Sequence, residues 1–466
     1  MKAALRFFEM YESVIHRIGL ILMVALSVTL PFQTRWLAVP AFLHGGYWEY
    51  GTLSVYITEI GIWVAFALWC AQWVAHQLSQ EKRIDWKEKI THVIHTQWVY
   101  WAILVWVLVQ LAWAPRTIAS GVWLVHAISA LLFYFLLVKF HMPLKIVVLA
   151  LAIGFSCSGV LGIAQFGSQR IASNTVLGIS AQQPEESGVS VVETPLRRWM
   201  RAYGTYPHPN IFGGMMVVGL SLWLLFFILA HDLVEPIDYW GRLIGVLGVV
   251  VTSAGLWLSF SRSAWLGFLI SMIVAWGVMV VKKRYWFIPL LKWTVLSIVM
   301  LVALSYLFDD PFRARTSFLT TEPVYGYRLE DQSKVIRMAQ WKEAYIIGIQ
   351  RTFGAGTGVG NYTAWLGIVY PSLKVYQLQP FHITPLLALI ELGVIGFAGV
   401  VVMITQWIRK NIKDAWALPV IAGFTTMMLF DHYWWTLFPG MIGVAIVAWL
   451  ALQKPSHHVQ LRIFGR

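Results

Sequence analysis

The chain has 466 residues, of which 58% are hydrophobic and only 12% are charged, whereas soluble proteins carry about 25% charged residues. This composition excludes a water-soluble surface, and the net charge of +13 suits contact with anionic lipid or phosphate groups. Apolar runs of about 20 residues recur along the chain, and each can cross a bilayer as a helix. Because the runs are continuous rather than alternating, they exclude a barrel. We predict an all-α polytopic membrane protein, with a single integral membrane domain over residues 1–466.

Twelve of these runs are candidate transmembrane helices. The first lacks a small-residue cleavage site, which favours a retained span over a signal peptide. Cys70 and Cys157 both lie inside apolar runs, so they indicate neither a disulfide framework nor a metal site. In chain order the expected spans are 15–32, 53–76, 97–114, 118–139, 144–165, 210–231, 241–259, 263–281, 287–308, 383–407, 414–431 and 435–452.

Basic residues in the short connections set the expected orientation. With twelve spans, these connections all fall on one side, which the positive-inside rule makes cytoplasmic. Both termini are then expected on the cytoplasmic side. The residues that define it include Lys2, Arg6, Lys82, Arg83, Lys139, Lys145, Lys282, Lys283, Arg409, Lys410 and Lys454.

Two long segments, 166–209 and 309–382, fall on the opposite, outer side. Loops of this length usually carry function or are disordered, and we expect these two to contain amphipathic helices. The clearest is DQSKVIRMAQWKEAYIIGIQ (331–350), whose apolar residues follow helical spacing and predict a helix that caps the bundle. A glycine-rich turn region, GAGTGVGNY (354–362), follows it.

Conspicuous polar residues are scattered in the sequence, yet the topology brings them to the outer face. Arg262 is the most informative, because it faces outward against the positive-inside bias, in a turn that is too short to need a charge. His382 opens the tenth span. The others at this face are Arg197, Arg198, Arg201, His208, Asn210, Asp431 and His432.

Most of these residues also have a purely structural interpretation. An arginine at the end of a span often extends to lipid headgroups. His208 and Asn210 could serve only to start a helix. Asp431 and His432 could form a local hydrogen-bonded pair at a helix end.

The remaining acidic residues offer weaker hypotheses. Asp309 and Asp310 resemble a metal-binding carboxylate pair, but Asp-Asp-Pro also simply ends a helix, and we expect no metal. Glu59, His126 and Glu391 are the main ionisable candidates within the membrane. For Glu391, about 13 Å along the helix from His382, we expect a packing hydrogen bond rather than chemistry.

His382 and the outward arginines together indicate a reaction. An imidazole with a pKa near 6.5 is a ready general base at near-neutral pH. Guanidinium groups fork onto phosphate oxygens and neutralise them without a metal. Such a set could take a proton from an acceptor hydroxyl and stabilise a departing diphosphate.

The motifs from roughly residue 200 to 400 resemble the O-antigen ligase/polymerase superfamily of bacterial membrane glycan transferases. The resemblance depends on the order, spacing and shared outward side of several motifs rather than on any single one. They are RAYGTYPHPNIFGG (201–214), SFSRSAWLGF (259–268), RMAQWKEAYIIGIQRTFGAGTGVGNY (337–362) and PFHITPLLALIELGVIG (380–396).

The resemblance implies a GT-C-type helical fold and transfer of a glycan from undecaprenyl diphosphate at the outer leaflet of a bacterial inner membrane, without metal or cofactor. It implies that His382 is the catalytic base and that Arg201 and Arg262, with Arg198, hold the diphosphate. Arg337 and Trp341 would belong to the outer helix over the site. Supporting candidates are His208, Asn210, Asp431 and His432. Ile383 departs from the pattern, because many relatives have Asn there.

The resemblance does not name the acceptor. We favour a ligase that moves a finished O-antigen to lipid A–core oligosaccharide, by a direct displacement that inverts the anomeric centre. A polymerase or a protein O-oligosaccharyltransferase would use the same donor chemistry. A transporter of lipid-linked glycans is disfavoured, because transporters place ionisable residues in mid-membrane and here the polar groups gather at one face. A scaffolding protein would not need His382 near Arg262. No nucleic acid partner is expected.

Overall fold

The computed structural model describes residues 2–79, 98–140, 142–231, 238–282, 284–316 and 337–454. Within them, eight helices are long and apolar enough to cross a membrane, and four shorter apolar helices correspond to the remaining expected spans. All twelve predicted spans therefore coincide with helices, and the prediction of an all-α polytopic membrane protein is confirmed. These helices are α1 (Lys2–Thr29), α2 (Ile57–Ser79), α4 (Trp98–Gln110), α5 (Thr117–Lys139), α6 (Leu144–Ser168), α7 (Pro209–His231), α8 (Tyr239–Leu258), α9 (Arg262–Val281), α10 (Phe287–Leu307), α14 (Thr384–Asn411), α15 (Ala417–Met428) and α17 (Phe438–Ala451).

Short strands and helices connect them. The strands form three two-stranded antiparallel pairs, β1 with β4, β2 with β3 and β5 with β6. These elements are β1 (Arg35–Val39), β2 (Phe42–Leu43), β3 (Gly46–Tyr47), β4 (Leu53–Tyr56), β5 (Val191–Glu193), β6 (Arg198–Met200), η1 (Glu49–Gly51), η2 (Arg284–Trp286), α11 (Asp309–Thr316), the π-helix η4 (Ile346–Arg351), α13 (Tyr362–Val369), η5 (Val375–Gln377) and α16 (Tyr433–Thr436).

Two details of the predicted organisation are wrong. The second span begins at Ile57 rather than at residue 53, because residues 53–56 pair with β1 as strand β4. The outer segment 166–209 contains the β5–β6 hairpin and isolated bridges after α6, not an amphipathic helix. Prolines, glycines and β-branched residues in this segment disfavour a helix and favour strands and turns. In the second outer segment, residues 337–345 are helical and run into η4, whereas residues 317–336 lie outside the described part.

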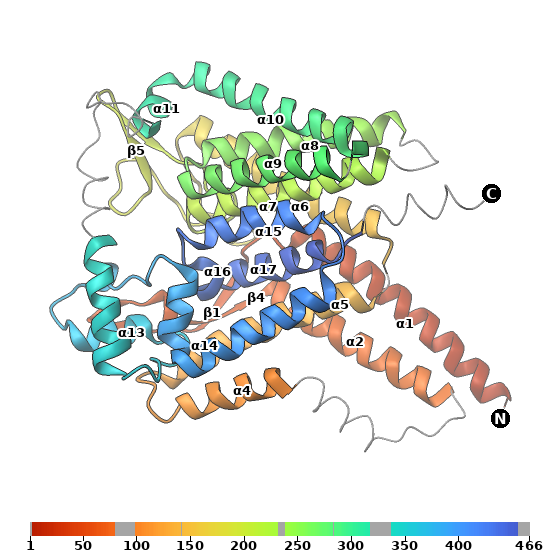
Figure 1. Cartoon of the computed structure of the whole chain (residues 1–466), viewed down its shortest axis with the longest axis horizontal. Coiled ribbons are helices and arrows are strands. Elements are labelled where there is room, and N and C mark those ends of the chain that lie inside the picture. The colour runs from red at the N-terminus through yellow and green to blue at the C-terminus, as the bar shows by residue number, and fades with distance from the viewer. Residues whose placement is uncertain are drawn as a thin grey trace.

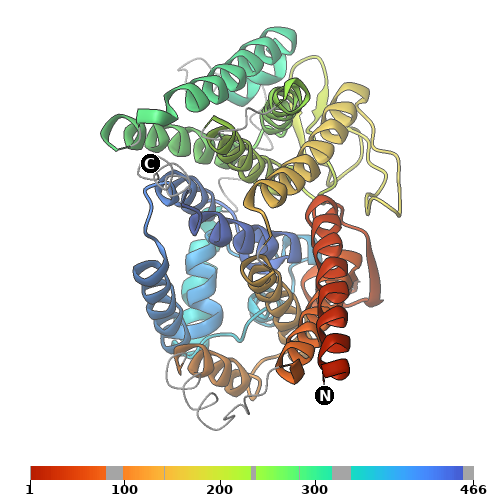
Figure 2. The same cartoon turned by 90° about the vertical axis from the view of Figure 1, so that its right-hand side faces the viewer.

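Helix α7 occupies the centre of the molecule, with nearly its whole length buried. It packs against α6, α8, α9 and α10. A helix that is apolar on every side is expected at such a position. Figure 2 shows α8–α10 on one side of the molecule and α2 and α4 on the opposite side. Helix α7, whose first turn contains Asn210, therefore forms the centre of the bundle.

Helix α14 is broken at Gly393, which has a left-handed φ of 67°. Glycine adopts this conformation without steric cost. The glycine-rich segment 354–358 lies against the break and supplies hydrogen bonds for backbone groups there: Thr357 N donates to Ile390 O, Gly358 N donates to Glu391 O, and Val394 N donates to Gly354 O. In an apolar environment, backbone N–H and C=O groups must find hydrogen-bond partners within the protein, because no water is present to bind them. The break therefore locks the glycine-rich turn to the helix that follows His382.

Strand β5 and helices α11, α13 and α16 lie together at the end of the bundle remote from the start of α1 (Figure 1). We call this end the site end. The connections that carry Lys139, Lys145 and Lys282 lie between helices at the other end. The expected separation of basic connections from polar motifs is thus visible in the arrangement of the elements.

Candidate active site

Arg201 follows strand β6 and is almost completely buried, with 6% of its surface exposed. Its Nε donates to the carbonyl of Ser259 at 2.7 Å, and Nη2 donates to Asn210 Oδ1 at 2.6 Å. Asn210 in turn donates through Nδ2 to Asp431 Oδ2 at 2.8 Å. A buried charge needs such partners. Arg201, Asn210 and Asp431 therefore form one hydrogen-bonded chain across the site end.

Close backbone packing at the start of α7 makes this chain possible. A Cβ atom at Gly213 would lie 2.6 Å from Ser259 Oγ, and one at Gly214 would lie 2.0 Å from Tyr433 Oη. Both distances are far below van der Waals contact. The two glycines thus allow α7 to approach the 259 turn and the 431–433 segment, which brings Asn210 between its two partners.

His208 starts α7 rather than facing a ligand. Its Nδ1 accepts the backbone N–H of Asn210 at 3.1 Å, so Nε2 carries the proton and donates to Ser190 Oγ at 3.0 Å. Burial, aided by the charge of Arg201, lowers the pKa of His208 to about 3. The neutral ring therefore acts as a helix-start residue, which is the structural one of the two alternatives that the sequence left open for it. Asn210, in contrast, bridges two charged side chains.

Asp431 connects this chain to the start of α14. Its Oδ1 accepts the backbone N–H of His432 at 3.2 Å, and its backbone carbonyl accepts the hydroxyl of Thr384 at 2.5 Å. Burial raises the pKa of Asp431 to about 6, although hydrogen bonds from Asn210 and His432 act in the opposite direction. Asp431 and His432 thus form the expected local pair and also join the segments that carry Arg201 and His382.

His382 lies two residues before α14 and is half-buried. Its Nδ1 lies 2.9 Å from Gln340 Oε1, and its ring meets His432 edge-on, with ring centroids 5.3 Å apart and an interplanar angle of 81°. Burial, with a smaller contribution from the charge of Arg337, lowers the pKa of His382 to about 4. The imidazole is therefore neutral near pH 7, as a proton acceptor must be.

His432 is buried as well. Its Nδ1 lies 2.9 Å from Thr436 Oγ1, and its ring also meets Tyr50 edge-on. Burial lowers the pKa of His432 well below its usual value, with the neighbouring His382 and His208 adding to the effect. The imidazoles of His208, His382 and His432 are therefore all neutral near pH 7.

Arg262 begins α9 directly after a strained turn. Phe260 has a left-handed φ of 47°, and the Ser261 hydroxyl accepts the N–H of Ala264 as the helix cap. The carbonyls of the turn are taken by two other arginines, Arg201 at Ser259 and Arg315 at Phe260, the latter through Nε at 2.9 Å. The turn thus gathers three guanidinium groups.

The charges of these arginines act on one another. Burial lowers the pKa of Arg201, and the positive charges of Arg315 and Arg262 lower it further. A guanidinium nevertheless stays protonated in proteins. Packed cations of this kind are an anion-binding arrangement. Arg315 lies on α11, and it was not among the residues predicted from the sequence. The only indication was that it is a basic residue in an outer segment.

Arg198 is not brought to this cluster. On strand β6 it forms an ion pair with Glu193, with Nε 3.6 Å from Oε1, and donates to the carbonyl of Glu185 at 3.3 Å. Its neighbour Arg197 lies over the ring of Trp199, with 3.3 Å between Cζ and the ring centroid. Both side chains therefore stabilise the β5–β6 hairpin.

The helix of residues 337–345 covers His382. Trp341 packs edge-on against Phe381 with ring centroids 5.2 Å apart, and the charge of the exposed Arg337 acts on both His382 and Asp431. Gln340, the buried member of this helix turn, also escaped sequence reasoning. Its position between Arg337 and Trp341 was the available signal, but nothing in the sequence indicated that its side chain points inward.

Asp309 and Asp310 begin α11, and Asp309 accepts a 2.6 Å ion-pair hydrogen bond from Arg313 one turn later. Acidic residues at the start of a helix and a basic partner four residues on are a common stabilising arrangement. The pair therefore begins helix α11, whereas the sequence analysis offered Asp-Asp-Pro as the end of a helix.

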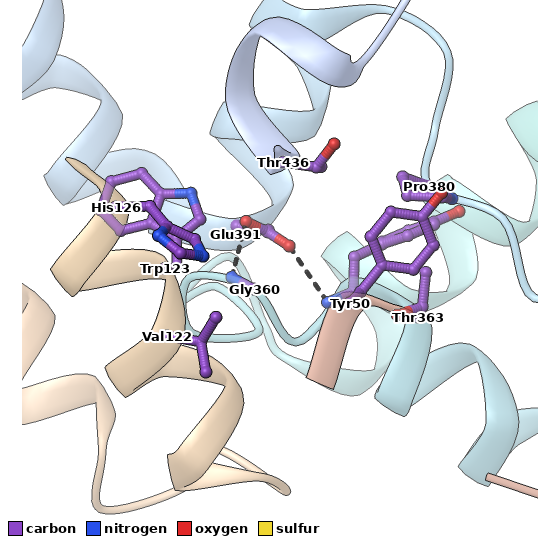
Figure 3. A pocket seen from close by; sticks show the side chains of 10 residues that line it. Tyr50, Val122, Trp123, His126, Gly360, Thr363, Pro380, Glu391 and Thr436 are labelled. Atoms are coloured by element: carbon purple, nitrogen blue, oxygen red, sulfur yellow. Dashed lines mark hydrogen bonds between the residues drawn. The ribbon is translucent and has the colours of Figure 1, made fainter. Parts of the chain in front are cut away.

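Glu391 lines a narrow cavity together with Tyr50, His126, Gly360 and Thr436 (Figure 3). Its carboxylate accepts the backbone N–H groups of Gly360 and Tyr362 at 2.9 and 3.2 Å and the indole N–H of Trp435 at 2.7 Å. The expected packing hydrogen bond is thus confirmed, and it fixes the glycine-rich turn. In the same part of the bundle, Glu59 Oε1 lies 3.0 Å from His126 Nδ1 and accepts the hydroxyl of Ser129.

Comparison with known proteins adds a family to this geometry. Residues 247–401 match the family model described as O-antigen ligase. The match runs from α8 to the middle of α14, and it includes Arg262, Arg315, Gln340 and His382. No curated protein matches the chain.

Proposed function

We propose that the chain, whose residues 247–401 match the O-antigen ligase family model, is a membrane glycosyltransferase that transfers an O-antigen glycan from undecaprenyl diphosphate to lipid A–core oligosaccharide. The observation that carries the proposal is the continuous path from Arg201 through Asn210, Asp431 and His432 to His382. It joins a cationic cluster to a neutral imidazole. A diphosphate leaving group and an acceptor hydroxyl need such a pair of functions.

In the proposed reaction His382 is the general base. As the acceptor oxygen attacks the anomeric carbon, His382 takes the hydroxyl proton, and the bond from the anomeric carbon to the diphosphate oxygen breaks. The electron pair of that bond leaves with undecaprenyl diphosphate. One direct displacement inverts the anomeric centre, and the protonated imidazole later returns its proton to solvent.

The arginines stabilise the departing diphosphate. Arg201 uses two of its five N–H groups on Ser259 and Asn210, which leaves three by subtraction for phosphate oxygens. Arg262, at the start of α9, and Arg315 add positive charge on the same turn. No metal is needed in this scheme, since the guanidinium groups neutralise the developing charge. Arg198 has a weaker claim to this role because it pairs with Glu193.

The proposed location is the bacterial inner membrane, with the site end facing the periplasm and both termini in the cytoplasm. The separation of the basic connections from the site end supports this orientation through the positive-inside rule. The diphosphate of a lipid-linked donor lies at headgroup level, and the path from Arg201 to His382 lies in the connections at the ends of helices rather than in mid-membrane. A GT-C-type arrangement, with single-domain organisation and outer loops 166–209 and 309–382 over the site, is part of the same proposal.

Purified protein in lipid nanodiscs tests the proposal with an undecaprenyl-diphosphate glycan, lipid A–core and a chelator. We expect chain transfer to the core by the wild type and none by His382→Ala, with both proteins equally inserted and folded. Longer donor chains without transfer to the core would indicate a polymerase. Transfer by His382→Ala at the wild-type rate would exclude the base assignment, and no turnover with either acceptor would reopen the transport hypothesis.

A further inference from the structure

Gln340 is the most thoroughly buried residue of its helix turn, with 4% of its surface exposed. Its neighbours Arg337, Met338 and Trp341 are all exposed. Glutamine is rarely buried unless its amide is hydrogen-bonded. The amide points toward the segment 380–382, directly before α14, and therefore toward His382.

Two hydrogen bonds fix the orientation of this amide. Nε2 donates to the carbonyl of Pro380 at 3.5 Å, and Oε1 faces Nδ1 of His382 at 2.9 Å. An amide oxygen only accepts hydrogen bonds. Nδ1 of His382 must therefore carry the proton, and Nε2 must hold the lone pair.

A general base needs that arrangement to be fixed in advance. A neutral imidazole exists as two tautomers, and the partner of one nitrogen decides which tautomer is present. Ile383, the next residue of the chain, has no polar side-chain atom, and the ring of His432 meets His382 edge-on rather than through a hydrogen bond. Gln340 is thus the described residue that can set the tautomer of His382.

We propose that Gln340 is the positioning residue of the catalytic base: it holds His382 in the Nδ1–H tautomer, so that Nε2 faces the acceptor hydroxyl. The inference depends on the proposed function. It also gives the helix of residues 337–345 a specific task, because the base is oriented only while that helix is docked. Packing of Trp341 on Phe381, next to His382, holds the helix in this position.

An amide in this position differs from a carboxylate in charge. Arg337 on the covering helix acts on the pKa of His382, and His382 acts on the pKa values of His432 beside α16 and His208 before α7; none of these three groups is an anion. With glutamine, the imidazole has a neutral partner and burial keeps it unprotonated. A carboxylate at the same position would favour the charged ring.

Two substitutions separate positioning from simple packing. Gln340→Leu keeps the volume but removes the acceptor, and we expect kcat to fall about 10- to 100-fold, by analogy with loss of the partner that orients a metal-ligating histidine, with KM nearly unchanged. Gln340→Glu keeps the acceptor and should retain turnover. Its charge should move the acid limb of the kcat/KM profile upward by about 1–2 pH units. Gln350→Glu, which makes the same change on the exposed face of η4, should leave the limb in place.

A second measurement does not depend on turnover. In ¹⁵N-histidine spectra of the protein in lipid bilayers, the His382 signals, identified by their loss in His382→Ala, should show a protonated Nδ1 in the wild type and a tautomer mixture in Gln340→Leu. An Nε2–H tautomer in the wild type, wild-type kinetics of Gln340→Leu, or an unmoved acid limb in Gln340→Glu would overturn the inference. Absence of transfer by the wild type would instead refute the proposed function.

Discussion

Replacement of Arg201 by lysine keeps one positive charge but removes the guanidinium geometry. In the wild type, Nε reaches the Ser259 carbonyl and Nη2 reaches Asn210 Oδ1, while the remaining N–H groups stay outside these bonds. A lysine ammonium is a single point and cannot reach both partners and a phosphate together. We therefore expect Arg201→Lys to impair both folding and transfer.

The expected size follows from the lost contacts. One hydrogen bond between a charged group and a buried partner contributes about 1.5–3 kcal/mol to stability, so the variant should unfold more easily by roughly that amount. Loss of a preorganised donor to the leaving group costs about 2.7–4 kcal/mol of transition-state stabilisation. The predicted fall in kcat/KM is therefore about 10²- to 10³-fold.

The pH dependence of the variant gives a sharper signature. Burial and the charges of Arg315 and Arg262, which lower the pKa of Arg201, would act on a lysine that starts from about 10.4. A lowered pKa means that the charge is lost as pH rises. The activity of Arg201→Lys, relative to the wild type, should therefore decline further as pH rises, and this decline should begin below the ordinary lysine pKa of about 10.4.

The assay compares kcat/KM for transfer from an undecaprenyl-diphosphate glycan in Arg201→Lys, the wild type and Arg197→Lys. The last variant makes the same change on the exposed arginine over Trp199 and should transfer at nearly the wild-type rate. The reasoning would be refuted if Arg201→Lys and Arg197→Lys were equally active at every pH. An unstable but fully active Arg201→Lys would limit Arg201 to a structural role.

Two further predictions concern charges around the site. Arg262→Lys should reduce transfer strongly, because a point charge cannot replace a bidentate guanidinium on the diphosphate; undiminished transfer would assign Arg262 to headgroup contact. Arg337→Ala removes a charge that lowers the pKa of His382, so the acid limb of kcat/KM should move to higher pH, whereas Lys342→Ala on the same helix should not move it. An unchanged limb in Arg337→Ala would mean that Arg337 does not act on the base.

The helices were predictable from the sequence because each is a long apolar run, and hydropathy alone identifies such runs. The elements between them were not, because their form depends on tertiary partners. Residues 53–56 read as the start of a span but pair with β1. Segment 166–209 has no apolar period long enough to reveal the β5–β6 hairpin. Strand pairing of this kind is decided by packing rather than by intrinsic preference.

The candidate site likewise contains residues that could be predicted from the sequence and residues that could not. His382 and Arg262 were predictable because each stands where a span begins, next to a turn. Arg198 and Arg201 looked equivalent, yet side chains alternate along an extended strand, and Arg198 pairs with Glu193 while Arg201 turns into the bundle. Gln340 and Arg315 could not be predicted, because only the docked positions of their helices bring them to His382 and to the Phe260 carbonyl.

The amide of Asn210 explains how a buried arginine remains available to a ligand. If Asp431 met Arg201 directly, a bidentate carboxylate would occupy two guanidinium donors and cancel the charge that a diphosphate needs. Asn210 separates them: its oxygen takes one N–H group of Arg201, and its nitrogen satisfies the carboxylate. The neutral bridge therefore satisfies both buried groups while the positive charge stays directed toward the site.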